Sequence, residues 1–242
     1  MEKRGSGALQ DFVFYSPTSD KILAMMANLF EPPRWIAVEG PLRVGKSTLA
    51  QILAETLQAR RIVEPEDNPF LDRFYQAEPG MGFATQLWFL MQRYEQMRQV
   101  KDFDTPVVSD YLFEKDKLFA YVNLSDAELA LYNRYYQMFR EEVPAPDLVI
   151  YLQASPEVLK QRLKRKGLPG ERTISDAYIE QVAAAYEHFF FHYTASDLLV
   201  VNTSEIDFVH NNRDLQLLLK RLAEPIQGTQ YFLPLGSDAS IE

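Results

Sequence analysis

Apolar runs bounded by turn residues recur along the 242-residue chain, and stretches with helical spacing separate them. Short apolar runs predict buried strands, whereas apolar residues three and four positions apart predict helices with one buried face. The predicted strands are Trp35–Glu39, Arg61–Glu64, Pro106–Asp110, Leu148–Leu152 and Leu198–Asn202. The predicted helices are Asp20–Phe30, Ser47–Leu57, Pro69–Ala77, Gly82–Val100, Phe113–Asn123, Asp126–Glu142, Pro156–Arg165, Ser175–Ser196 and Asn212–Ala223.

The order of these elements predicts an α/β fold. Strands that alternate with helices imply right-handed crossovers and a five-stranded parallel sheet flanked by helices. No repeat, low-complexity segment or linker interrupts the pattern, so we expect one domain over residues 35–225. Residues 1–34 form an N-terminal extension, and residues 226–242 form a tail that we expect to pack as a non-helical arm.

Composition excludes several kinds of partner. The chain has 25 basic and 34 acidic side chains, a net charge of −9, which argues against a protein that binds nucleic acid or an anionic membrane. It has no cysteine, so it has no disulfide or cysteine zinc site, and this fits a cytoplasmic protein. No stretch approaches the ~20 apolar residues of a membrane span.

Residues 40–48 read GPLRVGKST and match the phosphate-loop pattern G-x-x-x-x-G-K-S/T. In such a loop, backbone N–H groups and a helix N-terminus converge on an anion. Lys46 would reach the outer phosphates, and the Ser47 hydroxyl would lie on Mg²⁺. A chance match is the alternative, but the predicted strand before the loop and helix after it argue against that. The predicted site for ATP, or another nucleoside triphosphate, comprises Gly40, Pro41, Leu42, Arg43, Val44, Gly45, Lys46, Ser47 and Thr48.

Carboxylates follow the second and third predicted strands. Ligands of open parallel sheets bind at the carboxyl ends of the strands, where Glu64 and Asp110 would lie beside the phosphate loop. A carboxylate next to such a loop commonly holds Mg²⁺, so Asp110 is predicted to share the ion with Ser47. Glu64 is placed to accept a proton from an attacking hydroxyl. A solvated acidic turn remains the alternative for the segment at Glu64–Asp67.

The segment Gly82–Gln96 reads GFATQLWFLMQRYEQ. Residues three and four apart are neighbours on a helix, so an apolar face here carries one amide and one guanidinium group. Such a face suits a flat heterocycle that stacks on aromatic rings and hydrogen-bonds to the amide, although an amphipathic core helix is the alternative. The residues concerned are Phe83, Gln86, Phe89, Leu90 and Arg93.

Six of the thirteen residues in Lys160–Arg172 are Lys or Arg, in an otherwise acidic chain. A basic segment broken by glycine and proline can close over phosphates as a lid, which excludes water and supplies positive charge. A solvated helix end with basic residues near its C-terminus is the alternative. The three histidines, His188, His192 and His210, have no metal-site spacing.

Taken in order, these segments resemble the deoxyribonucleoside kinases, especially the bacterial deoxyadenosine/deoxyguanosine kinase branch. The resemblance covers roughly Trp35 to Ala223. It rests on the phosphate loop, EPEDNPFLDRFY at Glu64–Tyr75, F-x-x-Q-x-x-F-L-x-x-R-x-x-Q at Phe83–Gln96, KLFA at Lys117–Ala120 and the basic lid that ends in Glu171.

The resemblance implies a P-loop kinase fold with a basic lid. It also implies transfer of a phosphoryl group from ATP, with Mg²⁺, to the 5′-hydroxyl of a purine deoxynucleoside, in a cytoplasmic homodimer. Glu64 matches the general base, Tyr75 and Glu171 match residues that bind the sugar 3′-hydroxyl, and Gln86 matches the amide that reads the base edge. Arg93 lies at the base side, Phe83 and Phe89 form the base slot, and Arg162, Arg165 and Lys166 match lid positions near the phosphates.

The chain departs from the family after the third strand. The family usually has an acidic residue followed by Arg and Ser, and that arginine holds the base carboxylate and the substrate hydroxyl. Here Tyr111 follows Asp110, so either the reaction is weakened or a basic residue such as Lys115 or Lys117 takes the place of the arginine. Leu168 occupies a lid position where arginine is common. Two alternatives therefore stay open: a nucleoside monophosphate kinase, and a catalytically weak relative that binds nucleotide as a structural subunit.

Overall fold

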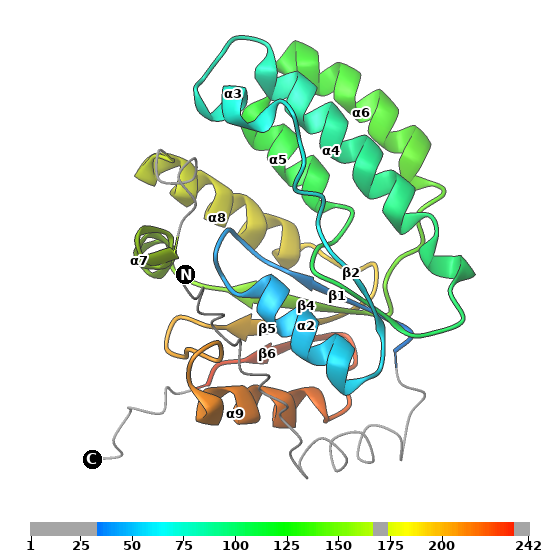
Figure 1. Ribbon diagram of the computed structural model, residues 1–242, viewed down its shortest axis with the longest axis vertical. Coiled ribbons are helices and arrows are strands. Elements are labelled where there is room, and N and C mark those ends of the chain that lie inside the picture. The colour runs from blue at the N-terminus through cyan, green and yellow to red at the C-terminus, as the bar shows by residue number, and fades with distance from the viewer. Residues whose placement is uncertain (1–32, 167–173, 235–242) are drawn as a thin grey trace, which may run out of the picture.

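The computed structural model describes residues 33–166 and 174–234 (Figure 1). The predicted helix Asp20–Phe30, part of the predicted lid and the end of the predicted tail lie outside these described residues. The fold class predicted from the sequence is confirmed within the described ranges, where a parallel sheet lies between layers of helices.

The sheet is formed by strands β1 (Trp35–Glu39), β2 (Arg60–Ile62), β3 (Val107–Ser109), β4 (Leu148–Gln153), β5 (Asp197–Asn202) and β6 (Thr229–Phe232). Its order is β2-β3-β1-β4-β5-β6, and all pairs are parallel. The predicted count of five strands is wrong, because β6 lies in the segment expected to be a non-helical arm. This short edge strand alternates exposed and half-buried residues, so it lacks the apolar run that marks a central strand.

Two strands end earlier than the apolar pattern predicts. The predicted strand Arg61–Glu64 ends at Ile62, and the predicted strand Pro106–Asp110 is reduced to Val107–Ser109. The reason is a contact between the two strand ends: the Glu64 backbone N–H donates to the Asp110 carboxylate, with 2.7 Å between the nitrogen and Oδ1. This bond ties together the two acidic residues at the carboxyl edge of the sheet.

The helices are α2 (Lys46–Thr56), α3 (Leu71–Tyr75), α4 (Met81–Met97), α5 (Lys115–Asn123), α6 (Asp126–Arg140), α7 (Pro156–Lys166), α8 (Asp176–Phe191) and α9 (Asn212–Leu222), with a 3₁₀ turn, η1, at Val100–Asp102. Two predicted helices are shortened most in the structure: Pro69–Ala77 is reduced to α3, and Ser175–Ser196 ends at Phe191. Among the described residues, no helix is long and apolar enough to cross a membrane.

Two faces of the sheet are buried by different helices. On one face, side chains of the central strands pack with α2 and α9, as Val38, Leu49 and Leu218 do in a single buried cluster. On the other face α8 covers the strands, and the rings of Tyr151 and Phe190 stack with centroids 4.1 Å apart. Burial on both faces explains why the central strands read as continuous apolar runs.

A separate helical layer of α3, α4, α5 and α6 rises above the sheet in Figure 1. Helices α4, α5 and α6 contact one another around a second buried cluster, in which the rings of Phe113 and Tyr136 stack 5.4 Å apart. β1 lies between β3 and β4, where the strand order reverses direction. Crevices at such a position are where open α/β sheets bind ligands.

Candidate active site

The phosphate loop joins β1 to α2, and two of its glycines have no room for a side chain. Gly40 has a φ of 152°, and a Cβ there would lie 2.3 Å from the Leu152 carbonyl oxygen. Gly45 has a φ of 112°, and its Cβ would lie 2.7 Å from Cζ of Phe208. Both positions therefore need glycine for its backbone freedom and for the close approach of neighbouring atoms.

Lys46 begins α2 and folds back over the loop. Its ammonium nitrogen lies 2.8 Å from the Gly40 carbonyl oxygen and 3.0 Å from that of Pro41. Burial and the nearby charge of Lys115 lower the pKa of Lys46 to about 8. Neutral carbonyl groups are its hydrogen-bond partners, so the lysine is placed to exchange them for phosphate oxygens.

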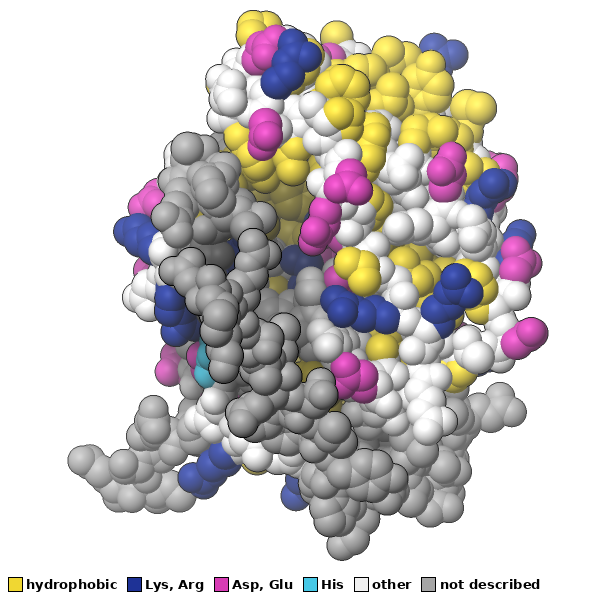
Figure 2. Space-filling view, in the orientation of Figure 1, with side chains coloured by type: hydrophobic (Ala, Val, Ile, Leu, Met, Phe, Trp, Pro, Cys, Tyr) yellow, Lys and Arg dark blue, Asp and Glu magenta, His cyan; other side chains and the backbone are white. Residues whose placement is uncertain are grey.

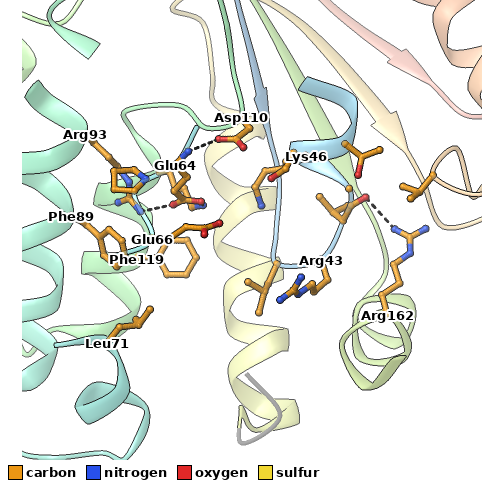
Figure 3. Close-up of a pocket in the computed structure, with 18 of the residues that line it drawn as sticks. Arg43, Lys46, Glu64, Glu66, Leu71, Phe89, Arg93, Asp110, Phe119 and Arg162 are labelled. Carbon is orange, nitrogen blue, oxygen red and sulfur yellow. Dashed lines mark hydrogen bonds and ion pairs between the residues drawn. The ribbon is translucent and has the colours of Figure 1, made fainter. Parts of the chain in front are cut away.

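A cavity of about 820 Å³ connects the phosphate loop with the helical layer. Figure 3 shows Lys46 on one side of this cavity and Glu64 on the other, beside Arg93 and Asp110. Predicted site residues from distant parts of the chain therefore share one space. Those that line it are Leu42, Arg43, Val44, Gly45, Lys46, Ser47, Thr48, Glu64, Tyr75, Gln86, Phe89, Arg93, Asp110, Arg162 and Arg165.

The Glu64 carboxylate is held by two cations. Arg93 Nη2 lies 2.7 Å from its Oε1, and Lys115 Nζ lies 2.6 Å from its Oε2. Burial disfavours the charged carboxylate, but Lys115 and Arg93 outweigh this and lower the pKa of Glu64 to about 2. Glu64 is thus ionised and fixed in orientation at neutral pH, and a bound hydroxyl group would find an acceptor there.

Arg93 also connects Glu64 to a buried carboxylate that the sequence did not single out. Its Nη1 donates to Asp116, whose Oδ2 accepts the hydroxyl of Tyr132 at 2.9 Å. The guanidinium carbon lies 4.5 Å from the centroid of the Phe89 ring. Arg93 therefore links the Glu64 carboxylate to the helical layer, in addition to its predicted place at the base side. The sequence signal for Asp116 was its place in a charged run, residues 114–117, just before the apolar run of residues 118–122.

Only some of the residues predicted to bind the nucleoside line the cavity. Gln86 is 3% exposed and lines the cavity, and its Oε1 has no hydrogen-bond partner among the described residues. A buried amide oxygen without a partner is costly, so a ligand donor would complete it. Tyr75 and Phe89 line the same space. Phe83 does not, and packs against the buried cluster of the helical layer.

The lid arginines contact the loop that follows β5. Arg162 donates to the Thr203 carbonyl oxygen at 2.7 Å and to that of Ile206 at 3.2 Å. Arg165 Nη2 lies 3.6 Å from Asp207 Oδ2. Lys166 ends α7, but its side chain and Glu171 lie outside what the structure describes. The first part of the predicted lid, with Arg162 and Arg165, therefore lies at the cavity. The assignment of Lys166 and Glu171 to the site stays a prediction.

The loop Ile206–His210 also lines the cavity, and sequence analysis missed it. Phe208 is buried against Gly45, and the His210 ring lies 2.9 Å from the Asp207 carboxylate. The polar segment SEIDFVHNN carries no motif, so its place beside the phosphate loop follows from the sheet order alone.

Tyr111 is fully buried, and its hydroxyl donates to Gln96 in the helical layer. The two lysines proposed to replace the missing arginine are placed very differently. Lys115 contacts Glu64, whereas Lys117 is exposed and its Nζ lies 5.7 Å from the centroid of the Tyr136 ring. Of the two, Lys115 is the lysine beside the carboxylate.

Ser47 and Asp110 offer one hydroxyl and one carboxylate to the cavity. Among the described residues, no cluster of three or more histidine, cysteine, aspartate or glutamate side chains could hold a metal ion. A sparse oxygen set of this kind fits Mg²⁺, which usually keeps several waters and binds through one or two protein groups plus substrate phosphates. It does not fit a metal that needs a complete protein cage.

The sequence model of one family, Deoxynucleoside kinase, matches residues 36–227. A deoxyguanosine kinase of Bacillus subtilis is 33% identical over 201 residues, which cover 79% of this chain and 97% of the relative. A deoxyadenosine kinase of Lactobacillus acidophilus is 29% identical over 207 residues, which cover 79% of this chain and 96% of the relative. The fold is similar to the solved structure of a deoxyadenosine kinase from M. mycoides with bound dATP, with a TM-score of 0.69 and 24% identity over 78% of this chain and all of that one.

Proposed function

The chain belongs to the deoxynucleoside kinase family, and from this premise we propose that it transfers the γ-phosphoryl group of ATP to the 5′-hydroxyl of a purine deoxynucleoside. One observation carries the assignment of the site. The ionised Glu64 carboxylate and the phosphate loop face the same cavity, so a nucleoside hydroxyl and a nucleotide phosphate would meet there.

The residues have separate tasks in this proposal. Lys46 and the loop amides hold the phosphates of the donor. Glu64 takes the proton of the 5′-hydroxyl as the new oxygen–phosphorus bond forms and the bond to ADP breaks. Mg²⁺, held by Ser47 and Asp110, would neutralise charge on the donor oxygens. Catalysis is mainly positioning and charge stabilisation, since the transition state is loose.

A nucleoside monophosphate kinase is the competing hypothesis within this fold. Its acceptor carries a phosphate, which needs cations beside the attacking oxygen. Here the charges of Arg93 and Lys115, on the acceptor side, are balanced by two carboxylates, those of Glu64 and Asp116. No net positive charge is left for a second phosphate, which favours an uncharged hydroxyl. Steady-state assays that compare deoxyguanosine and deoxyadenosine with their monophosphates test this. We expect turnover with the nucleosides, and turnover confined to the monophosphates would contradict the proposal.

Gln86 is proposed to read the base edge. Its unpartnered, buried Oε1 would accept a hydrogen bond from the base, and its amide nitrogen would donate one. The purine preference itself is supported by the relatives named above, which are called deoxyguanosine and deoxyadenosine kinases.

We expect Gln86→Ala to raise the KM for the preferred deoxynucleoside about 10- to 100-fold, since one or two buried hydrogen bonds are lost at about 1–3 kcal/mol. The KM for ATP should stay within a factor of about two. Gln99→Ala, at an exposed position beyond the same helix, is the matched control. An unchanged nucleoside KM in Gln86→Ala would remove Gln86 from the base site.

The protein is further proposed to be a homodimeric, cytoplasmic enzyme of nucleotide salvage. Figure 2 shows apolar side chains gathered at the top of the view, over α4 and α6. Met91, Leu131, Tyr135 and Met138 on these helices are 36–65% exposed. An exposed apolar patch of this kind marks an association surface.

We expect Met138→Asp combined with Leu131→Asp to convert a dimer into a monomer in sedimentation velocity, because the charges would be buried in the interface. Phe191→Asp is the control, as this residue is 79% exposed and belongs to the end of α8, not to α4 or α6. A wild-type monomer, or a double variant that remains dimeric, would reject this surface.

A further inference from the structure

Lys115 is a charged residue buried at the edge of the active-site cavity. It is 6% exposed, begins α5 and lines the cavity. Its ammonium group donates to Glu64 Oε2 at 2.6 Å and lies 5.6 Å from the centroid of the Phe119 ring. An ammonium group has three donors, and within the described ranges Glu64 is the hydrogen-bond partner it has. Two donors are therefore left for another acceptor.

The surroundings of Lys115 point to an anion as that acceptor. Lys115 is close enough to Lys46 that, after burial, its charge is the main influence that lowers the pKa of Lys46. Two buried ammonium groups near each other repel unless negative charge lies between them. The carboxylates of Glu39, Glu64 and Asp110 partly offset this repulsion at Lys46. The hydrogen bonds of Lys46, however, go to neutral carbonyl groups of the loop. A phosphoryl group that moves from the loop toward Glu64 would satisfy both lysines.

Tyr111 offers no such charge. Its ring is fully buried beside the Arg93 guanidinium, with 5.9 Å between Cζ and the ring centroid, and its hydroxyl is engaged by Gln96. Both terminal nitrogens of Arg93 are committed, because they bridge Glu64 and Asp116, and its remaining donor, Nε, is buried. Lys115 thus combines a positive charge, uncommitted donors on its terminal nitrogen and direct contact with Glu64 at the edge of the cavity.

We propose that Lys115 is a catalytic residue that donates to an oxygen of the transferring phosphoryl group while it holds Glu64 in place. This inference rests on the kinase function proposed above. As the 5′-oxygen bonds to phosphorus, its proton passes to Glu64 and the bond to the ADP oxygen breaks. Lys115 keeps its proton throughout and stabilises the negative charge that lies between the two oxygens.

The test compares Lys115→Met with Lys115→Arg and with Lys117→Met, the matched control two residues along the same helix. Loss of one charge-stabilising donor typically lowers kcat about 10²- to 10³-fold. We expect that loss in Lys115→Met, with the KM for ATP and for the nucleoside within about threefold of wild type. Lys115→Arg should recover at least about tenfold of the lost kcat, and Lys117→Met should behave as wild type.

A chemical rescue distinguishes loss of the ammonium group from misfolding of the variant. The chain has no cysteine, so Lys115→Cys carries a single thiol that 2-bromoethylamine converts into a lysine analogue. Alkylation of the unfolded protein followed by refolding should restore most of the kcat. A kcat in Lys115→Met within threefold of wild type, or an alkylated protein that refolds and binds ATP without recovery, would overturn the proposal. Absence of product with the wild-type protein would instead reject the kinase function itself.

Discussion

Replacing Glu64 with glutamine is expected to lower kcat by about 10²- to 10⁴-fold, the usual contribution of a general base. Glutamine has nearly the same shape, but its amide cannot take the proton of the 5′-hydroxyl. It also cannot pair as an anion with Arg93 and Lys115, which hold the carboxylate at 2.7 and 2.6 Å. ATP should still bind, because the phosphate loop lies on the other side of the cavity.

Steady-state kinetics and calorimetric titration with ATP measure the two effects separately. Glu66→Gln is the matched control, since Glu66 lines the same cavity but is exposed. A Glu64→Gln protein with a kcat within tenfold of wild type would remove Glu64 from the role of base. The variant also addresses the remaining alternative, a structural subunit that binds nucleotide without turnover, because such a protein would have no activity for the substitution to lower.

Lys46→Met is expected to lower kcat/KM for ATP by about 10²- to 10³-fold, as expected for loss of a preorganised cation on the phosphates. Methionine keeps most of the apolar side chain but removes the ammonium group that lies over the loop carbonyls. Lys101→Met, at an exposed position in η1, controls for the loss of one positive charge. The measurement is ATP binding together with initial rates at saturating nucleoside.

Unchanged kcat/KM for ATP in Lys46→Met would mean that the phosphates bind elsewhere. A variant that loses its fold would give no information on phosphate, so its melting temperature is compared with that of wild type. We expect the two melting temperatures to be similar without ATP. Burial of the Lys46 ammonium group costs solvation free energy, which its hydrogen bonds to the loop carbonyls only partly offset.

The strands of the sheet could be predicted wherever burial on both faces produces a continuous apolar run, as in Leu148–Gln153. β6 was missed because an edge strand with one exposed side has no such run. The ends of β2 and β3 were placed too late because the backbone of Glu64 turns to bond with the Asp110 side chain, a contact between residues 46 positions apart. Local patterns hold no information about that bond.

The candidate site also combines residues that local sequence predicts with residues that only the fold brings together. The phosphate loop is contiguous, so its residues and its flanking strand and helix could be read directly from the sequence. Helical spacing placed Gln86 and Phe89 on the cavity but did not separate them from Phe83, which faces the core of the helical layer. The contact of Lys115 with Glu64 joins α5 to the end of β2, and only the fold selects it over Lys117.

The most direct test of the account is to incubate the purified protein with Mg²⁺ and ATP labelled in the γ-phosphate, together with each of the four deoxynucleosides. We predict that the label appears in a 5′-monophosphate, fastest with deoxyguanosine or deoxyadenosine, and that a 5′-deoxy analogue of the preferred nucleoside receives none. No labelled monophosphate from any of the four deoxynucleosides, with ATP binding intact, would contradict the central claim.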